Sequence, residues 1–148
     1  MSDIRHRVGV QAPIDEVYDA VATREGLSHW WTSDVEGESR VGGALAFWFG
    51  RPDAVATMEV IESSRPGRVE WRCIQGPEEW VGTTISFDLR AEGEETVVLF
   101  AHAGWREPVE FLHHCTTAWG SYLLSLKRGL EGGTATPWPR NELVSSWG

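Results

Sequence analysis

Cysteine is scarce in this chain of 148 residues, which contains only Cys73 and Cys115. Two thiols far apart in sequence do not make the disulfide framework of a small secreted protein. The chain also lacks a run approaching the roughly 20 apolar residues of a membrane span and an N-terminal apolar stretch of signal-peptide length. These absences predict a cytoplasmic protein that does not insert into membranes.

Basic residues are also few, because 13 Lys and Arg stand against 22 Asp and Glu and give a net charge of −9. Binding to nucleic-acid phosphates or to an anionic membrane requires clustered Lys and Arg, and the sequence has no such cluster. It also lacks the Gly-x-Gly-x-x-Gly, P-loop, Gly-x-Ser-x-Gly and His-Glu-x-x-His patterns, which mark nucleotide sites and hydrolytic or zinc centres. We therefore expect no nucleic-acid partner and no cofactor.

One segment, Glu110-x-x-His113-His114-Cys115, invites a metal-site interpretation. Carboxylate-bridged di-metal sites use Glu-x-x-His twice, from two helices, and this chain has a single copy. His113 and His114 would also point about 100° apart on a helix. We therefore predict no metal site.

Tryptophan, by contrast, is abundant, with nine Trp against two Tyr. Indoles bring a large apolar area and an N–H group that needs an acceptor when it is buried. An ordinary Trp-rich core fits this composition, and so does an interior that keeps some space for a ligand.

The periodicity of apolar residues changes along the chain and predicts an α+β domain. Helical spacing indicates two short helices at about 14–22 and 24–31 and a long one at about 108–131. The long helix would measure roughly 36 Å, enough to cross a sheet. Segments bounded by Gly and Pro turns read as strands, at 4–10, 44–49, 54–62, 68–74, 81–90 and 96–104.

Alternation along these strands predicts a sheet with one apolar face and one wet face. Ile85, Phe87 and Leu89, for example, alternate with polar residues. The only element long enough to cover the apolar face is the last helix, so we expect a single domain over 1–148. An irregular tail is expected from about 132, and its Trp138 and Trp147 suggest that parts of it pack on the body.

Motifs along nearly the whole chain then carry a family resemblance: APIDEVYDAVAT, Trp30-Trp31, Val41-Gly42-Gly43, Val69-Glu70-Trp71, Phe100-x-His102-x-Gly104-Trp105 and Trp119-Gly120. The chain resembles the Bet v 1-like, START-related (SRPBCC) superfamily, and more narrowly the stand-alone bacterial domains named for the activator of Hsp90 ATPase. The resemblance implies the helix-grip fold: a strongly curved antiparallel sheet of about six strands, two short helices and one long C-terminal helix enclosing a cavity. It also implies that Val98, Phe100 and His102 point inward.

Residues on the presumed inner face form the predicted ligand-binding set: Trp30, Phe47, Phe49, Met58, Trp71, Cys73, Ile85, Phe87, Phe100, His102, Leu112, Thr116, Trp119 and Leu123. Flat apolar walls suit an aromatic or acyl ligand, and plain core packing is the alternative for each residue. Of Trp30 and Trp31, one would be core and the other a gate. Cys73 reads as an inert buried thiol, because the adjacent Arg72 should face the other side of the sheet.

His102 is the main polar candidate in this set and the one catalytic candidate. Facing a cavity, it could donate to a ligand oxygen or act as an acid/base near neutral pH. The alternative is a structural histidine that bonds to the backbone or lies against the Trp105 region.

We predict a binding module, a carrier or sensor for a small hydrophobic molecule. The first alternative is a polyketide cyclase/dehydratase-like enzyme that uses the same cavity and rests on His102, helped by Tyr122 or Thr116. The second alternative is a co-chaperone-like interaction domain whose acidic face binds a basic protein partner. Apolar residues on the wet side of the sheet would favour a homodimer, namely Trp48, Val97, Leu99 and Ala101.

Overall fold

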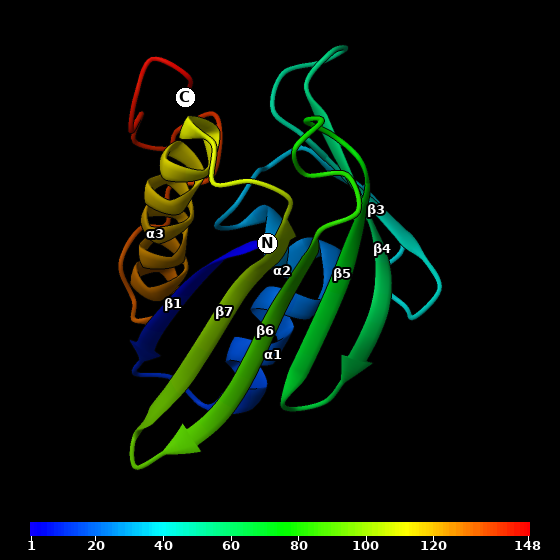
Figure 1. Cartoon of the computed structure of the whole chain (residues 1–148). Helices are drawn as coiled ribbons and strands as arrows, with labels where there is room; N and C mark the ends of the chain where they lie inside the picture. The colour runs from blue at the N-terminus through cyan, green and yellow to red at the C-terminus, as the bar shows by residue number, and fades with distance from the viewer.

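A strand, two short helices, six strands and a long helix follow one another in the computed structural model, which describes residues 1–148 (Figure 1). The elements are β1 (Ser2–Val10), α1 (Ile14–Ala22), α2 (Arg24–Ser28), β2 (Val35–Gly37), β3 (Ala44–Trp48), β4 (Val55–Ser64), β5 (Arg68–Gln75), β6 (Thr84–Glu92), β7 (Glu95–Trp105) and α3 (Glu110–Leu130).

The seven strands form one antiparallel sheet in the order β1-β7-β6-β5-β4-β3-β2. The first strand pairs with the last, so that Val8 lies opposite Val98. Figure 1 shows the sheet curling around α1 and α2, with α3 beside β1. The predicted α+β helix-grip fold is confirmed. The strand that the prediction missed is β2, because three residues are too few to show alternation.

The two faces of the sheet follow the alternation in sequence. On β5, Val69, Trp71 and Cys73 are each about 1% exposed, whereas Arg68 on the opposite face pairs with carboxylates of neighbouring strands. Strand β7 is apolar on both faces, and the structure places Val98 and Phe100 in the core. The family resemblance therefore predicted which residues of β7 face the interior, which the periodicity of this strand alone could not.

The outer face of the sheet does not gather the apolar residues that were expected to favour a dimer. Leu99 is 38% exposed, but Val97 is fully buried. The guanidinium of Arg51 covers the ring of Trp48 at 4.3 Å from its centroid.

Helix α3 packs its apolar stripe against the sheet and is held at its C-terminal end by β1. Cys115, Trp119 and Leu123 are buried on this stripe. Lys127 Nζ donates to the carbonyl of Gly9 at 2.5 Å. No helix of the structure is both long and apolar enough to cross a membrane.

The tail after α3 is irregular, as predicted, but it is tied to the body. The backbone N–H of Trp138 donates to the carbonyl of Trp31 at 2.8 Å, and the N–H of Ser33 donates to the carbonyl of Trp138 at 3.1 Å. These bonds lead the chain back along the side of α3 (Figure 1), so the last residues can form part of a site.

Candidate functional site

The space between the centre of the sheet and α3 is filled by aromatic side chains. Trp31 lies at the middle of this cluster, with its ring centroid 4.3 Å from that of Phe47 and 4.8 Å from that of Trp119. Trp71 stacks on Trp31 with ring centroids 6.1 Å apart. These rings are almost fully buried, so any ligand space must lie beside the cluster rather than at its centre.

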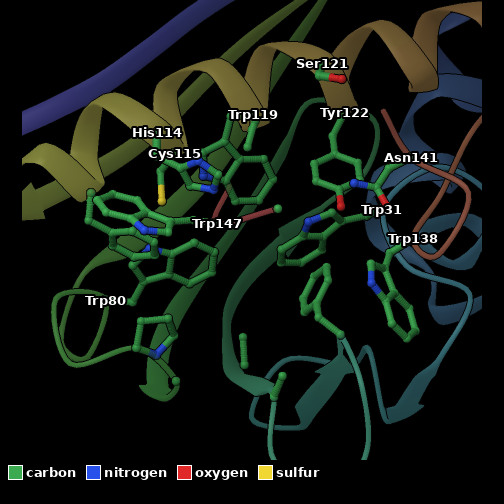
Figure 2. Close-up of a pocket in the computed structure, with 18 of the residues that line it drawn as sticks. Trp31, Trp80, His114, Cys115, Trp119, Ser121, Tyr122, Trp138, Asn141 and Trp147 are labelled. Atoms are coloured by element: carbon green, nitrogen blue, oxygen red, sulfur yellow. The ribbon is translucent and has the colours of Figure 1, made fainter. Parts of the chain in front are cut away.

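Such a space opens beside α3 as a cleft of about 660 Å³. Its walls come from α3, the adjoining ends of β3 and β4, the loop after β5 and the C-terminal tail (Figure 2). Aromatic side chains dominate the lining: Trp31, Phe49, Trp80, Phe111, Trp119, Tyr122, Trp138 and Trp147. The volume falls within the roughly 300–1,000 Å³ of small-molecule sites.

Tyr122 brings a hydroxyl group to the cleft. Figure 2 shows this side chain pointing from α3 into the cleft, on the same side as Trp31, Asn141 and Trp138. Partial burial raises the pKa of Tyr122 to about 12. The phenol is therefore protonated at neutral pH and can offer one hydrogen bond to a ligand.

The opposite end of the cleft is built from α3 and the last residues of the chain. His114 Nδ1 and Ser145 Oγ share a hydrogen bond of 2.6 Å, and the imidazole stacks on Phe111 with centroids 5.8 Å apart. Trp147 meets the imidazole edge-on at the same separation. Burial lowers the pKa of His114, so this end of the cleft carries a neutral imidazole at pH 7.

Cys115 lines the same end, but its thiol is not activated. Burial raises its pKa to about 12, whereas a nucleophilic cysteine needs a lowered pKa. The nearby indole nitrogen of Trp80 is buried without a hydrogen-bond partner. The Cys115 thiol is therefore protonated at neutral pH and is no activated nucleophile.

His102 lies outside the cleft lining, in a chain of hydrogen bonds that fixes its protonation. Thr83 Oγ donates to the carbonyl of Trp80 at 2.5 Å, so it must accept from His102 Nε2 at 2.8 Å. Trp119 Nε1 can only donate, and it reaches His102 Nδ1 at 3.1 Å. The imidazole is thus neutral with its proton on Nε2, and burial lowers its pKa to about 3.

This geometry favours a structural histidine over an acid/base at His102. Both ring nitrogens are engaged, and protonation of Nδ1 would place two N–H groups against each other. The partners are Thr83 and Trp119 rather than the backbone or Trp105, although the Trp105 ring does lie 5.1 Å away.

Of the predicted ligand-binding set, Phe49 and Trp119 line the cleft. The indole N–H of Trp30 donates to the carbonyl of Ala20 at 2.8 Å, and Trp31, its neighbour in sequence, lines the cleft instead. Leu112 and Thr116 are partly buried on α3 outside the lining. The others lie in the packed core or, for His102, against it: Phe47, Met58, Trp71, Cys73, Ile85, Phe87, Phe100, His102 and Leu123. Contact of these residues with a ligand stays a prediction. Burial also raises the pKa of Cys73 to about 11, which fits an inert thiol.

Sequence reasoning missed most of the cleft because its helical wall extends beyond the apolar stripe that was predicted for α3. Phe111, Cys115, Ala118 and Tyr122 follow each other at helical spacing and line the cleft together. Reading α3 for a second apolar stripe would have found them. Trp138 and Trp147 come from an aperiodic tail, which offers no comparable pattern. No three His, Cys, Asp or Glu side chains gather to hold a metal ion.

Comparisons with known proteins agree with this architecture. Residues 11–131 match the family model described as Activator of Hsp90 ATPase homolog 1-like protein. The Aha1 dimer from Colwellia psychrerythraea is 36% identical, with a TM-score of 0.80 over 90% of this chain and 98% of that one. No curated protein matches the sequence.

Two more distant structures share the fold. CalU16 from Micromonospora echinospora is 22% identical, with a TM-score of 0.74 over 90% of this chain and 76% of that one. SSP2350 from Staphylococcus saprophyticus is 20% identical, with a TM-score of 0.75 over 92% and 97%. At such identities the likeness concerns the fold alone.

Proposed function

Because the chain belongs to the Activator of Hsp90 ATPase homolog 1-like family and carries an aromatic cleft beside α3, we propose that it binds a small hydrophobic molecule there. The protein would act as a carrier or sensor. The observation that carries this proposal is the lining of the cleft, in which indole and phenyl rings surround about 660 Å³. An apolar ligand that fills this space removes aromatic surface from water, which is favourable by about 25 cal/mol per Å².

An aromatic ligand suits the cleft better than an acyl chain with a free carboxylate. Planar rings can stack on Trp31, Trp119 and Trp138. The lining contains no Lys or Arg that could pair with a carboxylate. Of the two ligand classes predicted from the sequence, aromatic and acyl, we therefore propose the aromatic one.

The cyclase-like alternative has less support from the geometry. A general acid or base works best with a pKa near the operating pH, whereas the pKa of Tyr122 is raised to about 12 and the neutral imidazole of His114 is bonded to Ser145. His102, on which that alternative rested, is not in the lining. A ligand would thus be held rather than transformed.

A substitution that fills the cleft tests the proposal without cutting into the core. Ala118 lies on the cleft wall, and Thr117 is exposed on the next position of the same helix. We expect Ala118→Trp to abolish saturable binding of the hydrophobic dye Nile red, whereas Thr117→Trp binds it as the wild type does. Both substitutions add the same indole to α3, so equal far-ultraviolet circular dichroism spectra would show that any difference in dye binding does not come from unfolding.

Native mass spectrometry of the protein as isolated gives a second readout, the mass of any co-purified molecule. The proposal fails if the wild type carries no bound molecule and shows no saturable dye binding. It also fails if both tryptophan variants bind the dye equally, because the dye would then sit elsewhere.

Two further predictions concern association: that the chain forms a homodimer and that it binds a protein partner. The Colwellia protein is described as a dimer, and we propose the same association for this chain. Light scattering behind size-exclusion chromatography checks it, and a monomer mass at every concentration would contradict it.

A further inference from the structure

The charged side chains that line the cleft are all acidic. Its lining contains the carboxylates of Asp53 and Glu142 and no Lys or Arg. Both residues are exposed, and neither carboxylate forms an ion pair or a hydrogen bond within the chain. A ligand group in the cleft that approaches either carboxylate therefore meets a negative charge with no ion-pair partner in the chain.

Three arginines lie close in sequence to the cleft walls, and none of them lines the cleft. Arg140, two residues before Glu142, forms no ion pair and lines a separate pocket beside α1 and α2, and the other two are bound elsewhere. Arg51 pairs with Asp34 at 2.9 Å and also with Glu36. Arg106 is bound by backbone carbonyls of the loop after β5, including that of Glu78 at 2.9 Å. Neither guanidinium lines the cleft. The net charge of the whole chain is −9, so the protein as a whole also attracts cations.

The two carboxylates come from the segments that also carry Phe49 and Trp138, which are the turn between β3 and β4 and the tail. Asp53 lies four residues after Phe49, and Glu142 lies four residues after Trp138. The rings of Phe49 and Trp138 are in contact, with centroids 6.3 Å apart. Aromatic faces attract a cation placed within about 6 Å of the ring centroid, and indole does so best. Acid groups and aromatic faces in these two segments therefore favour the same kind of ligand group.

We propose that the cleft selects ligands in which an apolar aromatic body carries a positively charged nitrogen, and that it discriminates against aromatic carboxylates. The charged nitrogen would lie near Asp53, Glu142 and Trp138, and the aromatic body would extend toward Trp119 and Trp80. This inference rests on the proposed function, because it names the class of ligand for the same cleft.

Three probes with one ring system separate charge from shape: 2-naphthylmethylammonium, 2-naphthylmethanol and 2-naphthoate. Each competes with Nile red for the wild-type protein at low ionic strength. We expect the ammonium to displace the dye at a concentration about tenfold below that of the carboxylate, with the alcohol between them. Added salt should narrow this difference, because both carboxylates are exposed.

The double variant Asp53→Asn with Glu142→Gln removes the charges and keeps the side-chain shapes. Its matched control is Glu25→Gln with Glu94→Gln, which changes the net charge equally at exposed positions outside the cleft lining. We expect the preference for the ammonium to shrink to about threefold or less in the cleft variant and to persist in the control.

The outcomes distinguish this inference from the function on which it rests. If 2-naphthylmethanol and Nile red do not bind saturably, the proposed function is wrong and the inference falls with it. If they bind but the carboxylate competes as well as the ammonium, the inference alone is overturned. An ammonium preference that is equal in the cleft variant and the control would overturn it as well, because the charge effect would then be global.

Discussion

Burial of the His102 imidazole, whose two ring nitrogens are hydrogen-bonded, makes the stability of the fold depend on pH through this residue. Its pKa in the folded protein is about 3, below the roughly 6.5 of an unfolded chain. As pH falls below 6.5, the unfolded state takes up a proton that the folded state refuses, so the free energy of unfolding declines. The slope from this one group reaches about 1.4 kcal/mol per pH unit and vanishes above pH 6.5.

We therefore predict that His102→Gln weakens the pH dependence of stability. At pH 7.5 the variant should lose about 1–3 kcal/mol, because a buried hydrogen-bond chain is disturbed. Between pH 6.5 and 4.5 its stability should fall less steeply than that of the wild type. Urea unfolding at several pH values measures both. His29→Gln, at the exposed residue that follows α2, is the control and should keep the wild-type slope. Parallel curves for the wild type and His102→Gln would contradict the assignment.

At the scale of elements, the tail after α3 is the part of the cleft wall that has no regular secondary structure. Trp147 is 54% exposed although its ring contacts Phe111. The backbone bonds that dock the tail lie at Trp138, before the last residues of the cleft wall. Trp138 thus both docks the tail and lines the cleft, whereas Trp147 lines the cleft beyond these backbone bonds.

We predict that ending the chain after Arg140 preserves the fold and weakens binding. The docking bonds at Trp138 remain, so the far-ultraviolet dichroism should not change. Loss of the Trp147 face removes apolar contact area from the ligand, and we expect Nile red to bind roughly tenfold more weakly. Full-length Trp147→Ala should reproduce most of this loss. Unchanged affinity in both proteins would show that the tail is not part of the binding wall.

The elements also show how far the sequence alone could lead. Alternation predicted the inner residues of β5 and β6, and helical spacing predicted α3 to within two residues at each end. Strand β2 was missed because it has only three residues. The helical and strand periodicities of apolar residues are local patterns. They show which residues face the interior, but they do not show whether those side chains fill the interior or leave a cavity.

At the scale of the whole molecule, the position of the cleft depends on side-chain volume that no local pattern reports. Trp31 and Trp71 fill the middle of the curved sheet, and the free space is displaced to the side of α3. The set predicted from the sequence is aromatic, as is the lining of the cleft, but most of its members lie in the packed core. Finding Tyr122 and Trp138 required the three-dimensional packing of segments distant in sequence.

A ligand in this cleft must stabilise the whole domain, because the cleft joins α3, the sheet and the tail, which separate on unfolding. A molecule that binds only the folded chain adds about 2.7 kcal/mol at a concentration 100 times its Kd. For a domain of this size, we expect the melting temperature to rise by about 5–10 °C. Differential scanning calorimetry in the presence of 2-naphthylmethanol checks the prediction, because heat uptake does not depend on the fluorescence of the probe. Thr117→Trp should show the wild-type rise, and Ala118→Trp should show none. A rise of equal size in Ala118→Trp would place the binding outside the cleft, and a fall in the wild type would mean that the probe prefers the unfolded chain.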